Sequence, residues 1–119
     1  MPKYDTNRIV GAIRVAAKIA SEVDPGPGLE NDGGTCNFDA AFLSVPGMRE
    51  AQAEEIMRLA NIPGSPGLRV SLSNHSLFGR ILMLHCYNGQ ANRRTVMAEA
   101  AKKSLASQGL DAGMYYQMD

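Results

Sequence analysis

The sequence is poor in the residues and patterns that mark several functional classes, namely cysteine, histidine, aromatic residues, an excess of one charge and long apolar runs. Its 119 residues include no tryptophan, two cysteines and two histidines, and aromatic residues make up 6% of the chain. Lysine plus arginine balance aspartate plus glutamate at 12 each, so no overall field attracts nucleic acid or an anionic membrane. No apolar run approaches the length of a membrane span, and the first residues lack the apolar core of a signal peptide. We therefore expect a cytoplasmic protein that binds neither membranes nor nucleic acid.

The few cysteines and histidines form no familiar catalytic or metal-binding pattern. Cys36 and Cys86 lack metal-ligand spacing and are expected to be free thiols in a reducing compartment. His75 and His85 have no spaced partner, so we expect no metal site and no cofactor. A nucleophilic set of Cys36, His85 and Asp39 is unsupported, because strand alternation directs Cys36 away from Asp39. We expect His85 to be a core histidine and the protein not to be an enzyme.

The spacing of apolar residues predicts a single ligand-binding domain, 1–119, of the α+β class. An amphipathic, alanine-rich helix is expected over residues 5–23. After it the predicted elements are a strand (35–45), a helix (48–60), two strands (68–73 and 80–87), a helix (92–108) and a strand (112–118). With right-handed crossovers this order predicts a ferredoxin-like fold, in which a four-stranded antiparallel sheet spanning 35–118 carries both helices on one face.

The helix at 5–23 is an addition to that fold and has to pack over the open sheet face or across a subunit boundary. The open face and this helix together give more apolar surface than one small domain should expose. We therefore expect a homodimer or a higher homo-oligomer with the first helix at the interface.

The segment YNGQANRRT, residues 87–95, is the strongest candidate for a binding site. A strand that turns through Asn-Gly onto a helix start leaves backbone N–H groups unpaired, and these attract anions, phosphate above all. Arg93 and Arg94 are unfavourable in a first helical turn unless an anion balances them. The alternative is a plain helix start, capped by Asn92, with two solvated arginines.

Polar residues from the first and last predicted strands extend this site. Thr35, Asn37 and Asp39 share one face of the strand at 35–45, and Tyr115 and Gln117 share one face of the last strand. We expect all five on the open sheet face, where a small polar ligand would bind. The same polar residues would also fit the solvent face of an edge strand.

The expected ligand-binding residues combine three chemistries: arginines for phosphates, amides and a carboxylate for hydroxyls and base edges, and aromatic rings for stacking. The full set is Thr35, Asn37, Asp39, Asn74, Phe78, Gln90, Asn92, Arg93, Arg94, Thr95, Tyr115 and Gln117.

Three segments resemble the small phage proteins of the first Thoeris anti-defence family: GTCNFD (34–39), GQANRRT with MAE (89–99) and YYQMD (115–119). The likeness covers most of the chain after the first helix. It implies a non-catalytic sponge that captures cyclic ADP-ribose isomers made by bacterial TIR enzymes, in some members also cyclic oligonucleotides, inside an infected host cell. It also implies dimers or assemblies of dimers.

The family's clamp on the adenine has no unique match in this sequence, because Phe78, Tyr87 and Arg94 all compete for that role.

Other functional classes remain open. A regulatory module that binds amino acids at a dimer interface would need no arginine pair. A small phosphate-ester hydrolase on this fold would need a glycine-rich arginine loop after the first strand, where the chain offers only Pro46, Gly47, Met48 and Arg49. RNA-recognition domains share the strand order, but the strand at 80–87 lacks their aromatic signature.

Overall fold

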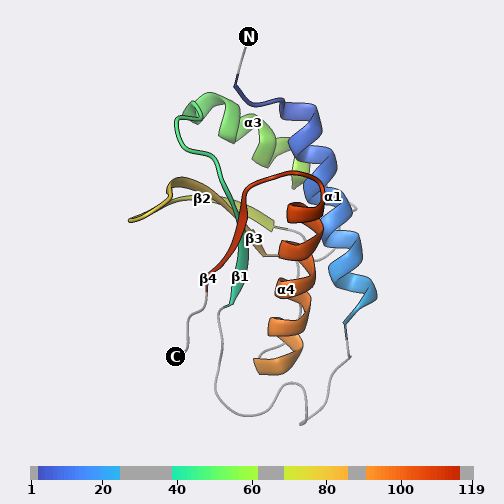
Figure 1. Ribbon diagram of the computed structural model, residues 1–119. Helices are drawn as coiled ribbons and strands as arrows, with labels where there is room; N and C mark the ends of the chain where they lie inside the picture. Colours follow the sequence, from blue (N-terminus) through green and yellow to red (C-terminus); the bar gives the residue numbers. More distant parts are fainter. Residues whose placement is uncertain (1–2, 25–38, 62–68, 86–90, 116–119) are drawn as a thin grey trace.

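The computed structural model describes residues 3–24, 39–61, 69–85 and 91–115, with the side chains of 91 and 92 left out (Figure 1). The elements are α1 (Thr6–Glu22), β1 (Ala40–Ser44), α3 (Glu50–Ala60), β2 (Arg69–His75), β3 (Gly79–His85), α4 (Ala91–Ser107) and β4 (Ala112–Tyr115). The four strands form one antiparallel sheet in the order β2-β3-β1-β4. This is the predicted ferredoxin-like arrangement of strand, helix, strand, strand, helix and strand.

Local chemistry sets the ends of the helices. The Asp5 side chain caps α1 by accepting a hydrogen bond from the backbone N–H of Arg8, at 3.1 Å. After α4 the chain turns through Gly109, whose φ of 81° lies in the left-handed region that glycine adopts without strain. The start of α1 and the end of α4 each lie within one residue of the predicted bounds, 5 and 108.

Helices α3 and α4 cover one face of the sheet. Helix α4 packs on β1 and β4, and α3 packs on β2. Strand residues Leu43, Leu82 and Leu84 are buried in this core. On α4, Met97, Ala101 and Leu105 are buried in this core, whereas Val96 is only partly buried.

The first helix packs on the other helices and not on the sheet. Helix α1 lies alongside α4 and also contacts α3 (Figure 1). Its apolar residues Ile9, Ile13 and Ala16 are buried in the same core as the strands. Of the two placements expected for this helix, the open sheet face is therefore wrong, and the subunit boundary stays a prediction. Its apolar stripe is covered within the chain, and the homo-oligomer stays a prediction that no longer rests on this stripe.

The second sheet face carries Phe42 and Ile81, which are buried outside the main core. The β2–β3 hairpin is longer than predicted, since β2 continues to His75 and only residues 76–78 form the turn. The rings of His75 and Phe78 lie 5.7 Å and 5.6 Å from the ring of Phe42, centroid to centroid. The hairpin tip thus covers Phe42 with aromatic rings.

The outer edge of β2 is partly occupied by a side chain. Just after α3, the Asn61 amide donates to the backbone oxygen of Val70 at 3.1 Å and accepts from its N–H at 2.8 Å. One amide thus takes the place of a neighbouring strand at this residue.

Gly113 is required by the ring of Phe42. The two residues pair across β1 and β4, and a Cβ at Gly113 would lie 2.6 Å from the Phe42 ring. We expect Gly113→Ala to lower the free energy of unfolding by about 1–3 kcal/mol through overpacking, measured by chemical denaturation.

Gly11→Ala is the matched control. Gly11 lies on the exposed side of α1, with no atom within 4 Å of an added Cβ, so this change should stabilise the protein by about 0.5–1 kcal/mol. Equal responses of the two glycines would contradict the steric role of Phe42.

Candidate functional site

Arg93, in the first turn of α4, is held by an acidic residue of the chain itself. Its Nε and Nη2 donate to the two carboxylate oxygens of Asp24 at 2.8 Å and 2.9 Å, and the side chains are 15% and 16% exposed. Asp24 closely follows the end of α1, so this bidentate ion pair ties α4 to α1. The guanidinium edge that a phosphate would use is occupied, so Arg93 has a structural partner that sequence spacing did not reveal.

Arg94 and Thr95 both bind Asp39, immediately before β1. Arg94 Nε donates to the backbone oxygen of Asp39 at 3.1 Å, and Thr95 Oγ1 donates to its carboxylate at 2.8 Å. The Asp39 side chain is 4% exposed and points toward α4. It was expected on the open face, and this was wrong. Strand alternation holds, but the side of β1 that carries Leu43 faces the helices, and Asp39 shares that side.

Two further basic residues lie at the same end of the sheet. Arg69 at the start of β2 pairs with His85 at the end of β3, and Ser71 Oγ lies 3.2 Å from His85 Nε2. Burial, and then the positive charges of Arg69 and Arg94, lower the pKa of His85 from its usual 6.5. Sequence analysis missed this cluster, because only the register of β2 and β3 brings residues 69 and 85 together.

Not all of the other predicted ligand-binding residues lie at the end of the sheet that carries Arg69, His85 and Arg94. Asn74 and Phe78 lie at the hairpin tip, about six residues along β2 and β3 from the Arg69–His85 pair, which is roughly 20 Å. They are therefore not brought together with the arginines, since both strands run away from that end. Tyr115 pairs with Ala40 and does lie at the arginine end, but on the sheet face opposite to Asp39. The predicted residues outside the described part of the chain are Thr35, Asn37, Gln90, Gln117 and the side chain of Asn92.

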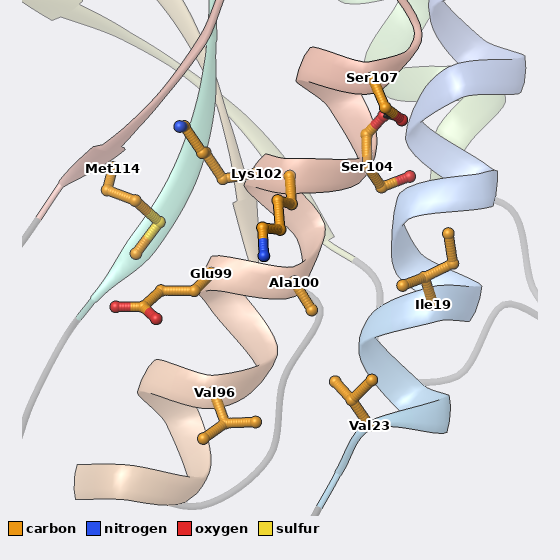
Figure 2. Close-up of a pocket in the computed structure, with 10 residues that line it drawn as sticks. Ile19, Val23, Val96, Glu99, Ala100, Lys102, Ser104, Ser107 and Met114 are labelled. Atoms are coloured by element: carbon orange, nitrogen blue, oxygen red, sulfur yellow. Dashed lines mark hydrogen bonds between the residues drawn. The ribbon is translucent and has the colours of Figure 1, made fainter.

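A groove of about 780 Å³ runs along α4 between α1 and β4 (Figure 2). Its walls include Val23, which caps the end of α1 and precedes Asp24, and Val96, about one turn along α4 from Arg93. Polar groups come mainly from α4, among them Glu99 and Lys102. None of the predicted ligand-binding residues that the structure describes lines this groove, so its size alone does not make it the nucleotide site.

Within the described ranges, no three histidine, cysteine, aspartate or glutamate residues are grouped so as to hold a metal ion. In that same part of the chain, no helix is long and apolar enough to cross a membrane. Comparison of the chain with protein families, curated proteins and solved structures finds no match. The resemblance to the Thoeris anti-defence family therefore stays a prediction.

The Asp24–Arg93 pair should contribute to folding. In a double-mutant cycle with Asp24→Ala and Arg93→Ala, we expect a coupling free energy of about 1–2 kcal/mol, because the bidentate pair is largely shielded from solvent. Chemical denaturation of the four proteins measures it.

The exposed pair Glu55–Arg58 on α3 is the matched control, and its coupling should be too small to resolve. A negligible coupling for Asp24–Arg93 as well would remove the structural role assigned to Arg93.

The pKa of His85 predicts how stability depends on pH. Because this pKa is lowered in the folded protein, the unfolded chain binds the proton more strongly. Stability should be complete above about pH 6.5 and fall as the pH drops from there toward the folded-state pKa. The melting temperature of His85→Gln should fall less than that of the wild type between pH 7 and pH 5. Parallel profiles would show that His85 does not contribute.

Proposed function

We propose that the protein binds a phosphate-bearing nucleotide and sequesters it without chemical change. The observation that carries this proposal is the meeting of Arg69, His85 and Arg94 at one end of the sheet. Among the described residues, the charged groups that lower the pKa of His85 are the cations Arg69 and Arg94, and like charges at such a site disfavour one another. An anionic ligand would relieve this cost, and phosphate suits arginine through paired, charge-assisted hydrogen bonds.

The row of residues across the sheet supports a ligand with a base at one end and phosphates at the other. Ala41 pairs with Leu84, so Ala40 lies beside His85, and Ala40 pairs with Tyr115. Arg69, His85 and Tyr115 therefore stand in one row, and the outer two are about 14 Å apart at a strand spacing of roughly 4.8 Å. The Tyr115 ring, 37% exposed, is available for stacking on a base.

The surroundings of Asp39 favour binding over hydrolysis. Cleaving a glycosidic or phosphate bond normally needs an acid and a base, or a metal-held water. The carboxylate of Asp39 is buried and accepts the Thr95 hydroxyl, which suits it to hold α4 against β1. This arrangement is that of a structural carboxylate, and it leaves the basic cluster as the part of this site suited to a ligand.

The resemblance to the Thoeris anti-defence family suggests what the ligand is. On this proposal the protein acts in the cytoplasm of an infected bacterium, where it captures a cyclic ADP-ribose isomer or a cyclic oligonucleotide and so blocks defence signalling. Capture of a scarce signal needs a dissociation constant of about nanomolar order, roughly 12 kcal/mol. A second copy of the chain that closes over the ligand would help to supply this.

Replacing the arginines tests the site. We expect Arg69→Gln and Arg94→Gln each to weaken binding of ADP-ribose, by about 1.5–3 kcal/mol, because each loses a charge-assisted hydrogen bond to phosphate. Isothermal titration calorimetry measures the change. Arg69 is the cleaner position, since it is exposed, whereas Arg94 also holds the backbone of Asp39.

Arg49→Gln is the matched control, because Arg49 is an exposed arginine at the start of α3, and it should bind like the wild type. Equal binding by all four proteins would refute the anion site. Mass spectrometry of a long incubation should return the nucleotide intact, and a product that accumulates with time would refute sequestration.

A further inference from the structure

We infer that His85 is a third phosphate ligand beside Arg69 and Arg94, and that it acts in its protonated form, so that nucleotide capture takes up a proton. The inference rests on the proposed function and adds to it one binding residue and a dependence on pH.

The position of His85 in the sheet is the first support. Arg69 is its partner on β2, and on the other side Ala40 of β1 lies beside it. The residue before Ala40 is Asp39, whose backbone oxygen holds Arg94 Nε. Arg69 thus flanks the half-buried imidazole on β2, and Arg94 is bound at Asp39, next to Ala40. An anion held by both arginines would lie at this end of the sheet, beside the ring.

The hydrogen bonding of the ring is the second support. Nε2 lies 3.2 Å from Ser71 Oγ, and a serine hydroxyl can either donate or accept. This contact therefore survives when the ring gains a proton. Among the described residues the second ring nitrogen has no hydrogen-bond partner, and in the protonated ring it becomes a donor suited to a phosphate oxygen.

The charges around the ring determine whether the pKa of His85 is raised or lowered in the protein without ligand. Arg69 faces it from β2 and Arg94 from α4, while β1 contributes Ala40 and β4 the phenol of Tyr115. The carboxylate of Asp39 is engaged with Thr95 on the helix side of the sheet. Without ligand, burial and the two arginines lower the pKa of His85, so the ring is neutral at pH 7.

A bound phosphate would favour the protonated form of His85 over the neutral form, since it offsets the charges of both arginines and accepts a hydrogen bond from the protonated ring. The pKa of His85 should then rise on binding. Affinity should increase as the pH falls through the bound-state pKa and level off below the free-state pKa, where both forms are protonated.

ADP-ribose is a suitable probe, because each phosphate of its diphosphate bridge has a single ionisable oxygen that keeps its charge between pH 5.5 and pH 8. We expect wild-type affinity to rise about tenfold from pH 8 to pH 5.5, which corresponds to one unit of pKa change. Calorimetry in two buffers of different ionisation enthalpy should detect proton uptake. In His85→Gln the pH dependence and the uptake should be lost, while sensitivity to Arg69→Gln is kept.

The second histidine provides an internal control. His75 lies at the hairpin tip, where its Nδ1 accepts the backbone N–H of Leu77 at 3.0 Å. In an NMR titration of the wild type, adding ADP-ribose should raise the pKa of His85 and leave the ring signals of His75 in place. This measurement does not depend on the folding of the variant.

The outcomes separate the two proposals. An arginine-dependent affinity with the same pH profile in the wild type and in His85→Gln would overturn the role of His85 and leave the proposed function standing. No binding of ADP-ribose at either pH would overturn both.

Discussion

A buried carboxylate at the start of β1 holds the start of α4 against the sheet. Asp39 accepts the hydroxyl of Thr95 through its side chain, and its backbone oxygen accepts from Arg94. Burying a charged group without partners would be costly, so these donors are a condition of the fold at this point. The same contact holds Arg94 beside Asp39, while strand register places Arg69 beside His85.

The two faces of the sheet are covered by different kinds of side chain. One face is covered by α3 and α4, with α1 packed against both helices, and it forms an aliphatic core. The other face buries Phe42 beneath the hairpin tip and leaves its opposite end polar, where His85 and Ser71 meet. Aromatic rings of the chain thus cover one end of this face, while arginines lie at the other end. A polar, negatively charged ligand would suit the end with the arginines.

The fold followed from the sequence because apolar periodicity and strand order leave few topologies. The candidate site followed only in part. Arg94 was among the predicted binding residues and lies at the basic end of the sheet. The side of β1 that faces the helices, however, depends on how Leu43 and Phe42 pack. Local alternation cannot decide between the two sides. Arg69 and His85 meet only through strand register, and Asp24 meets Arg93 only through the packing of α1 on α4. Such contacts between distant segments leave no local pattern.

The amide of Asn61 makes the two edges of the sheet unequal for pairing with a further strand. By taking both backbone groups of Val70, it denies the edge of β2 to an incoming strand at that residue. Strand β4 forms the opposite edge of the sheet. An edge-to-edge contact through β2 would therefore have to displace this amide at Val70. In a chain lacking the Asn61 amide, the N–H and C=O of Val70 would be open to such a contact.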